Sequence, residues 1–350
     1  MEHLNRIAQG FTYLCHSYAC HSDVIRLSHL RWNPVLSEWI IVSPARHERP
    51  ILGREGCPFC PGAEEVKGDW DVKSIPNKYP ALSPDSPEPA SEAGYVSKPA
   101  RGIAEVVVTS RRHDDRLDTM PQGQVEKVLS LFAERTLSLY KEHYVKYVYV
   151  FENFGSAIGV TLTHPHAQIY GMPFVPPVVK RELASAKRYL GLHGRCLFCT
   201  IISRELSSRI RLVDLNKDFI AFIPFYARWA FEVHVYPRRH VAFLHELRRQ
   251  EIVSLAKILK RIVTGFNSMY GFPFSYVMAF HQAPLGKERG YHFHIEFYPP
   301  HRQKDKLKHL AGIEQGGGTF LSDTLPEEKA SELRDKLNRK GLSTSNVPRA

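Results

Sequence analysis

The residues of this chain best suited to chemistry are His164 and His166, which are separated by one proline and followed by Gln168. Much of an imidazole is unprotonated near neutral pH, and in that form it is a nucleophile toward phosphorus. An amide can donate a hydrogen bond to a phosphoryl oxygen without adding a charge that competes with the nucleophile. Because Pro165 fixes φ and interrupts a regular strand, we expect the two rings to diverge, one toward a metal and the other toward a substrate.

A second copy of this pattern lies 128 residues further along, at His292 and His294, with Glu296 in the place of Gln168. Each copy opens with a Cys-x2-Cys pair and continues through a strand that ends in a histidine. This shared order indicates a duplicated unit. Because a carboxylate at position 296 would repel a phosphate, we expect the second copy to be non-catalytic.

The cysteines and histidines of each copy are the ligands that tetrahedral structural zinc requires. One such pair alone could be two idle thiols, but two pairs followed by histidines at matching places favour metal. A third pair, Cys15/Cys20, lacks this pattern and is interpreted as unremarkable thiols. We therefore expect two zinc ions per chain, on Cys57, Cys60, His113 and His164 in the first copy and on Cys196, Cys199, His240 and His292 in the second.

The net charge of +11 and the pI near 9.3 suit an anionic partner, either nucleic acid or a phosphorylated small molecule. No apolar run reaches the ~18–20 residues that span a membrane, and no secretory signal is visible, so we expect a cytoplasmic protein without a membrane partner. A zinc-dependent nucleic-acid-binding protein is the alternative from another class. Its compact fingers would differ from ligand sets that each span roughly 100 residues, so no nucleic-acid partner is expected.

The order of strands, helix and strands in each half predicts an α+β fold with an antiparallel sheet. An amphipathic helix is expected in each copy, from residue 124 to about 142 and from 244 to 269, because apolar residues recur there at helical spacing. A strand hairpin is expected at 31–43 and a linking helix at 182–192. The expected organisation is a flexible leader at 1–24, a first, catalytic repeat at 25–180, a second repeat at 181–338 and a flexible tail at 339–350.

Two loops could hold phosphate near the histidines. Arg46 and Arg49 lie in a proline-bounded segment, and their guanidinium forks suit phosphate oxygens, although a solvated basic loop is the plainer alternative. The segment from Asn153 through Gly159 to Thr161 offers an amide, small residues and a hydroxyl close to the nucleophile in sequence. We expect this second segment to cradle a ligand.

Six segments carry a resemblance to a known family, from about Arg31 to about Lys336: SPARHERP (43–50), CPFC (57–60), NKYPAL (77–82), FENFGSAIG (151–159), HPHAQIYG (164–171) and KHLAGIEQGGGTF (308–320). They resemble the galactose-1-phosphate uridylyltransferase family, a duplicated branch of the histidine triad superfamily. The resemblance implies two tandem histidine-triad-like repeats, with His166 as nucleophile, His164 as a zinc ligand and Gln168 steadying the intermediate. It implies contacts to nucleotide, phosphate or sugar from Arg46, Arg49, Asn77, Asn153, Gly159, Thr161, Lys308 and Glu314.

The resemblance also implies a two-step reaction in galactose metabolism. UMP would pass from UDP-glucose to His166 and then to galactose-1-phosphate, in an enzyme that can be a homodimer. An ADP-glucose phosphorylase-like enzyme, which would use an adenylyl group and inorganic phosphate, is the nearest alternative. Thr161 replaces the serine of the best-known members and keeps the hydroxyl.

The ligands of the second metal are where this chain departs from the family's pattern, because family members use two different ligand sets. Some members hold a second metal on a glutamate and three histidines, which match Glu182, His281, His292 and His294, whereas others use a Cys-x2-Cys pair with two histidines. Both sets are present here, and His292 cannot serve two metals. We favour the cysteine set because it repeats the first site ligand for ligand.

Overall fold

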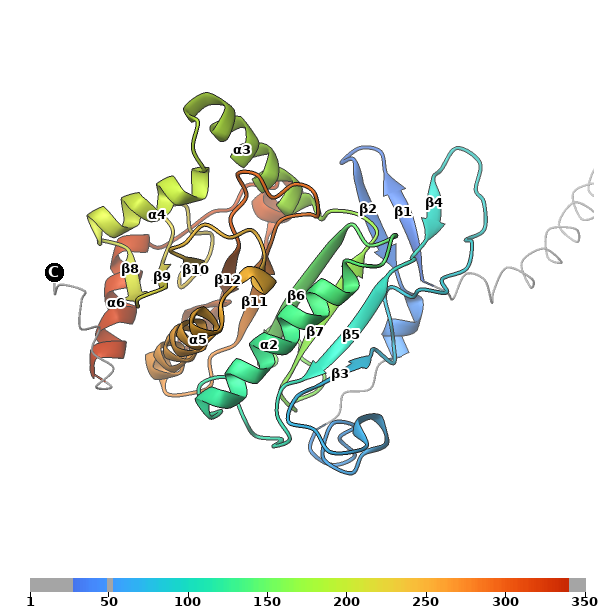
Figure 1. Ribbon diagram of the computed structural model, residues 1–350, viewed down its shortest axis with the longest axis horizontal. Coiled ribbons are helices and arrows are strands. Elements are labelled where there is room, and N and C mark those ends of the chain that lie inside the picture. The colour runs from blue at the N-terminus through green and yellow to red at the C-terminus, as the bar shows by residue number, and fades with distance from the viewer. Residues whose placement is uncertain (1–27, 49–52, 340–350) are drawn as a thin grey trace, which may run out of the picture.

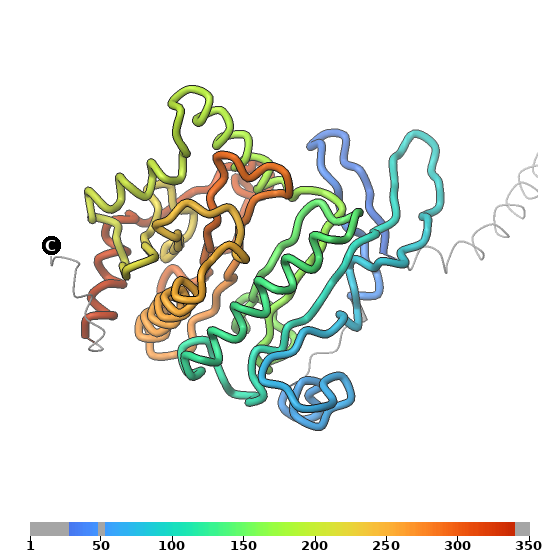
Figure 2. The backbone as a smooth tube through the Cα atoms, in the orientation of Figure 1, coloured from blue at the N-terminus to red at the C-terminus, as the bar shows by residue number. Residues whose placement is uncertain are grey.

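The computed structural model describes residues 28–48 and 53–339, which are shown in Figures 1 and 2. The predicted leader at 1–24 with Cys15 and Cys20, the loop residue Arg49, and residues 340–350 of the predicted tail lie outside the described residues. Among the helices that are described, none is long and apolar enough to cross a membrane.

A nine-stranded antiparallel sheet runs through both repeats (Figure 1). The first repeat supplies four neighbouring strands and the second supplies five, and they join where β6 pairs with β11, with Val150 opposite Phe280. The two predicted sheets are therefore halves of one continuous sheet. Its strands are, in spatial order, β3 (Lys73–Pro76), β5 (Ile103–Val108), β7 (His166–Met172), β6 (Tyr147–Phe154), β11 (Tyr276–His281), β12 (His294–Tyr298), β10 (Val233–Pro237), β9 (Phe219–Phe222) and β8 (Leu212–Leu215).

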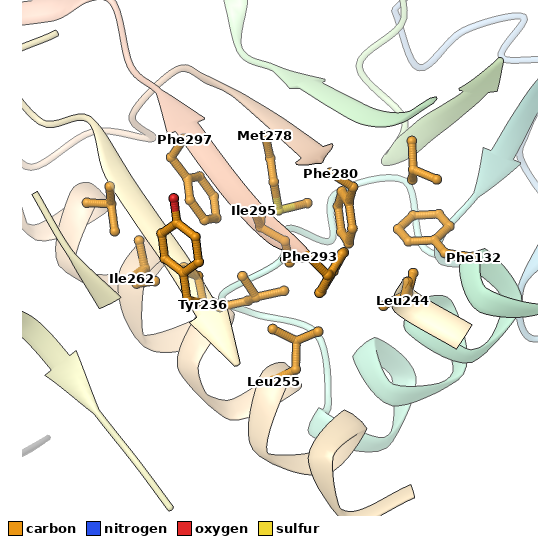
Figure 3. Close-up of a cluster of buried hydrophobic side chains, with 14 of the residues drawn as sticks. Phe132, Tyr236, Leu244, Leu255, Ile262, Met278, Phe280, Phe293, Ile295 and Phe297 are labelled. Atoms are coloured by element: carbon orange, nitrogen blue, oxygen red, sulfur yellow. The ribbon is translucent and has the colours of Figure 1, made fainter. Parts of the chain in front are cut away.

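One amphipathic helix from each repeat covers the same face of this sheet, α2 (Gln122–Leu139) and α5 (Arg249–Tyr270), and the two helices contact each other (Figures 1 and 2). Both predicted helices are confirmed, although a separate short turn, η4 (Leu244–Glu246), precedes α5. Figure 3 shows Phe132 of α2 and Leu255 of α5 facing Phe280 and Ile295 of the sheet, and all four are buried. Burying each such side chain contributes about 1.5–3 kcal/mol, so this layer stabilises the packing of the two helices on the sheet.

A small separate sheet holds the predicted hairpin at 31–43, which is confirmed: β1 (His29–Asn33) pairs with β2 (Glu38–Val42), and Trp32 lies opposite Trp39. β4 (Ser97–Pro99) pairs with β1 and adds a third strand to this sheet. It lies within a proline-rich segment that otherwise forms a loop. The predicted linking helix at 182–192 lies within α3 (Pro177–His193), which begins five residues earlier and ends one residue later. The remaining elements are α4 (Leu197–Ser208), α6 (Pro326–Arg339), β13 (His301–Gln303), β14 (Lys306–Leu307), and the short turns η1 (Pro44–Glu48), η2 (Glu64–Val66), η3 (Ser156–Ile158) and η5 (Gly312–Gly316).

Candidate active site

His166 is the first residue of β7, which lies between β5 and β6 in the sheet. Its Nδ1 is 2.8 Å from the carbonyl oxygen of His164. Because a carbonyl can only accept, Nδ1 must carry the hydrogen, and the lone pair of a neutral ring is then on Nε2. His164 precedes the strand and is 1% exposed, whereas His166 is only partly buried. The two rings thus make different contacts, with the Nδ1 of His164 near the cysteines and the Nδ1 of His166 at the His164 carbonyl oxygen, and the role of His166 as nucleophile stays a prediction.

Gln168 lies two residues further along β7, on the same face as His166, and is buried. Its Oε1 accepts a hydrogen bond of 3.4 Å from the Tyr170 hydroxyl, which leaves the amide hydrogens as the donors that this side chain can offer. Tyr170 in turn accepts a hydrogen bond of 3.3 Å from Arg46. Arg46 also donates to the Tyr79 carbonyl oxygen at 3.1 Å, so Arg46 is tied to Gln168 through Tyr170. Sequence reasoning missed Tyr170, which the period of two along β7 could have identified.

Two cavities border His166. The smaller, of about 180 Å³, is lined by both apolar and polar side chains, including the predicted substrate residues Asn77 and Thr161 and the predicted catalytic residue Gln168. The larger, of about 520 Å³, includes the predicted Asn153 and the basic side chains Arg54 and Arg116. The nucleophile candidate His166 therefore lines both cavities, which between them also include the predicted substrate residues Asn77, Asn153 and Thr161.

The loop between β6 and β7 has a conformation that glycine makes possible. Gly155 has φ +92°, and a Cβ there would lie within 3 Å of Ser275, so only glycine fits without displacement. Gly159, also predicted to contact substrate, ends the turn η3 with φ +74°. Asn153 and Gly155 of this segment line the larger cavity and Thr161 lines the smaller one, whereas Gly159 lines neither, so a ligand-cradling role of the segment stays a prediction.

The first predicted metal set comes together as a compact cluster of two sulfurs and two ring nitrogens. The Sγ of Cys60 is 3.4 Å from the Nδ1 of His113, and the Sγ of Cys57 and of Cys60 are each 3.6 Å from the Nδ1 of His164. In a tetrahedron with Zn–S bonds of ~2.3 Å and Zn–N bonds of ~2.0–2.1 Å, ligand sulfur and nitrogen are about 3.5 Å apart. The four side chains therefore fit a zinc ion.

The ring of His164 is oriented for metal by its other nitrogen. Its Nε2 donates to the carbonyl oxygen of Ser110 at 2.8 Å, so Nδ1 presents its lone pair to the cysteines. Burial lowers the pKa of His164, which favours the neutral form that a metal ligand needs. The carbonyl that orients His166 belongs to this same residue, which links the metal cluster directly to the nucleophile candidate.

The second predicted metal set repeats this arrangement. The Sγ of Cys199 is 3.2 Å from the Nδ1 of His240 and 3.4 Å from the Nδ1 of His292, and Cys196 completes the cluster. The Nε2 of His292 donates to the Pro237 carbonyl oxygen at 2.9 Å, as His164 does to Ser110. Cys196 and Cys199 flank the start of α4, an element that sequence reasoning did not predict. This set also fits a zinc ion.

The alternative ligand set for the second metal, a glutamate and three histidines, is arranged differently from what the resemblance implies. Glu182, His281 and His294 gather with Glu296, whereas His292 belongs to the cysteine cluster. The expected conflict over His292 is therefore absent, and both groups can form in one chain. Although burial opposes it, the carboxylates of Glu182 and Glu296 raise the pKa of His281 to about 9. A buried charged network therefore occupies the place in the second repeat that corresponds to His166 and Gln168 in the first. It consists of Glu182, His281, His294 and Glu296.

Lys308 and Glu314 are not brought to His166 within one chain. The ammonium of Lys308 donates to the carbonyl oxygens of Arg228 and Leu321 at 2.8 and 2.6 Å and lies 3.6 Å from the Glu314 carboxylate. Both residues are buried, and neither lines the two cavities beside His166. Their contacts to substrate stay a prediction.

Glu152 borders the larger cavity and extends between the sheet and the two helices, beside Leu129, Phe132 and Met278. Burial raises the pKa of its carboxyl from the ordinary 4.5 to about 7, while a hydrogen bond of 3.3 Å from the Tyr276 hydroxyl works against this rise. The folded chain therefore retains a proton on Glu152 at pH values where the unfolded chain has lost it.

This difference predicts a pH-dependent stability. Between about pH 4.5 and pH 7 the folded state binds the additional proton, so stability falls as pH rises, by roughly 3 kcal/mol in total. We expect Glu152→Gln to remove this loss, because an amide does not ionise. The midpoint of urea unfolding should fall more for the wild type than for the variant between pH 5.5 and pH 8. Parallel pH profiles for the two proteins would show that Glu152 ionises normally in the fold.

The chain was then compared with known proteins. Two family models match it, "Galactose-1-phosphate uridyl transferase, N-terminal domain" over residues 19–176 and the corresponding C-terminal domain over 182–345. The galactose-1-phosphate uridylyltransferase of Thermotoga maritima is 36% identical over 315 residues, covering 88% of this chain and 98% of the relative. That of Haemophilus influenzae is 32% identical, covering 87% and 93%.

Two solved structures extend the comparison to the fold. A uridylyltransferase structure matches with a TM-score of 0.83 and 43% identity, covering 89% of this chain and 99% of that one. An ADP-glucose phosphorylase from Arabidopsis thaliana with bound ADP-glucose matches with a TM-score of 0.69 and 27% identity, covering 87% and 98%. Both activities weighed from the sequence are thus represented among proteins of similar fold.

Proposed function

We propose, from the premise that this chain belongs to the galactose-1-phosphate uridylyltransferase family, that it transfers UMP from UDP-glucose to galactose-1-phosphate through a covalent intermediate on His166. The observation that carries the proposal is the hydrogen bond from His166 Nδ1 to the His164 carbonyl oxygen. In a neutral ring this bond puts the lone pair on Nε2, and His166 lines two cavities that also include predicted substrate residues. Membership of the family supports uridylyl transfer as the reaction class. The hydrogen bond at Nδ1 supports Nε2 of His166 as the attacking atom.

In the first step, Nε2 of His166 attacks the α-phosphorus of UDP-glucose. A P–N bond forms while the bond from the α-phosphorus to the bridging oxygen breaks, and glucose-1-phosphate leaves with the electron pair. In the second step, a phosphate oxygen of galactose-1-phosphate attacks the same phosphorus, the P–N bond breaks, and UDP-galactose forms. His166 ends as it began, with its hydrogen on Nδ1.

Gln168 stabilises the negative charge that these steps place on the phosphoryl oxygens. With its Oε1 engaged by Tyr170, its amide hydrogens are available to a nonbridging phosphoryl oxygen. The guanidinium of Arg46, which reaches Gln168 through Tyr170, adds positive charge on the same side of the sheet. Arg46 thus supports phosphate binding, either directly or by fixing Tyr170.

Two zinc ions per chain are part of the proposal, one on each cluster of two cysteines and two histidines. With four protein ligands, each zinc is structural and orders the segments that it joins. In the first repeat these segments include His164, whose carbonyl orients the nucleophile. In the second repeat they join α4 to the strand that carries His294.

A homodimer is the proposed assembly. The side chains of Leu310, Ile313 and Leu321 are exposed around the buried Glu314, and apolar side chains grouped in this way are typical of a surface that another chain covers. A second copy covering this segment would be the route by which Lys308 and Glu314 approach a substrate. The partners are otherwise the nucleotide sugar and the hexose-1-phosphate.

The function is tested by supplying two donor and acceptor pairs separately. UDP-glucose with galactose-1-phosphate should give UDP-galactose and glucose-1-phosphate in equal amounts. ADP-glucose with inorganic phosphate should give no ADP at a comparable rate. The reverse result would assign the chain to the ADP-glucose phosphorylase activity instead.

A further inference from the structure

We propose that Glu65 binds the ribose hydroxyls of the nucleotide donor and thereby selects ribonucleotides over deoxyribonucleotides. This assignment rests on the proposed function and adds a residue to it. In the smaller cavity beside His166, Glu65 is the one acidic side chain among the described lining residues. The lining of this slot combines apolar side chains, among them Phe59, Ile75 and Val106, with polar ones such as Asn77 and Lys78.

The direction of the slot follows from strand register. Gln168 lies opposite Val106, and Val106 lies opposite Ile75, so these residues form a row across β7, β5 and β3. Two strand spacings of about 4.8 Å make this row about 10 Å long. A nucleotide whose α-phosphorus is at His166 can therefore extend along the row toward the edge strand β3. Glu65 lies beyond β3, at the end of the row that is remote from His166. Its negative charge there does not repel the phosphates.

The turn that carries Glu65 is held in place by a small hydrophobic cluster, separate from the main core, that includes Phe59, Val66, Ile75 and Val106. Val66 is fully buried in this cluster and anchors the turn η2 against β3. The side chain of Glu65 is 26% exposed and borders the cavity. An apolar floor with a fixed carboxylate at its end suits a ribose and a flat base.

Lys78 and Asn77 complete the polar end of the slot. The Nζ of Lys78 is 3.4 Å from the Oε1 of Glu65, in a partly exposed ion pair of the kind that contributes little to folding. Asn77 uses its Oδ1 to accept a hydrogen bond from the Tyr79 amide at 3.0 Å, so its remaining polar atoms are donors. Vicinal hydroxyls would find an acceptor in Glu65, as ribose finds an acidic residue in dinucleotide-binding folds, and a donor in Asn77.

The test compares UDP-glucose with its 2′-deoxyuridine counterpart as donors, measuring the rate at which His166 acquires the nucleotide. Wild-type protein should prefer the ribonucleotide by about 10- to 150-fold, the range of one charge-assisted hydrogen bond. Glu65→Ala should lower this preference by about 10-fold or more, with the Asn77 donor remaining, chiefly by raising KM for UDP-glucose with little change in kcat, because the contact is remote from phosphorus. Glu65→Gln should fall between, since its amide oxygen still accepts.

Glu64→Ala is the matched control, because Glu64 is the preceding residue of the same turn, pairs with Lys67 and is 81% exposed. It should keep the wild-type preference. An unchanged preference in Glu65→Ala, an equal loss in Glu64→Ala, or a wild type indifferent to the 2′-hydroxyl would overturn the assignment. If wild-type His166 acquired no nucleotide from either donor, the proposed function itself would fail, and the assignment with it.

Discussion

His166→Ala should abolish the exchange of glucose-1-phosphate with UDP-glucose, by on the order of 10⁴-fold or more, because no other group can form the P–N bond. Folding and zinc content should stay near those of the wild type. His166 is partly exposed and lines two cavities, so its removal leaves little void in the core. Exchange of radiolabelled glucose-1-phosphate into UDP-glucose measures the effect directly.

His143→Ala serves as the control, since His143 is an exposed histidine of the same repeat, outside the cavities. It should exchange at the wild-type rate. His166→Gly should recover transfer when uridylyl-imidazole is supplied, because the missing ring then arrives with the substrate. Ordinary exchange by His166→Ala would exclude a covalent route through this residue.

The second large effect is expected from the first metal cluster. Cys57→Ala should release one zinc ion and lower uridylylation of His166 by about 100-fold or more, since losing an orienting shell typically costs 10–100-fold and here a direct ligand is lost. The physical link is His164, which offers its ring to the metal and its carbonyl to the nucleophile. Elemental analysis and the rate of the first half-reaction report the two losses.

Cys196→Ala in the second cluster is the comparison that isolates this link. It should also release one zinc ion and should lower the melting temperature, but uridylylation of His166 should change only slightly, because His292 orients His294 and not the nucleophile. Two zinc ions retained by Cys196→Ala would exclude the cysteine cluster as a metal site. Equal loss of uridylylation in the two variants would show that the metal clusters act only on overall folding.

The sequence was sufficient where local pattern determines structure. The predicted hairpin at 31–43 is present as β1 and β2, because a turn signal between two β-rich runs specifies such a pairing locally. The two metal clusters followed from repetition of the same ligands at matching places. α4 was missed because the segment starting at Cys196 was interpreted only as a ligand pair, although the residues after it have helical spacing.

Long-range pairing was the part that could not be predicted. The register that joins the two repeats, with Val150 of β6 opposite Phe280 of β11, links residues 130 positions apart and leaves no local signal. The neighbours of Glu296 in the fold also come from distant parts of the chain. Glu296 was therefore interpreted only as a replacement for Gln168. In the fold it lies among His234, His281 and His294, and although burial opposes it, these histidines hold the pKa of its carboxyl well below the usual range.

The central claim, a uridylyl group on His166, is tested most directly by mass spectrometry of the protein after incubation with UDP-glucose alone and with ADP-glucose alone. Digestion under mildly alkaline conditions preserves the P–N bond. We predict that UDP-glucose adds one UMP to the peptide containing His166 and that ADP-glucose adds nothing. A protein without covalent nucleotide after both incubations, or one carrying AMP from ADP-glucose, would contradict the account.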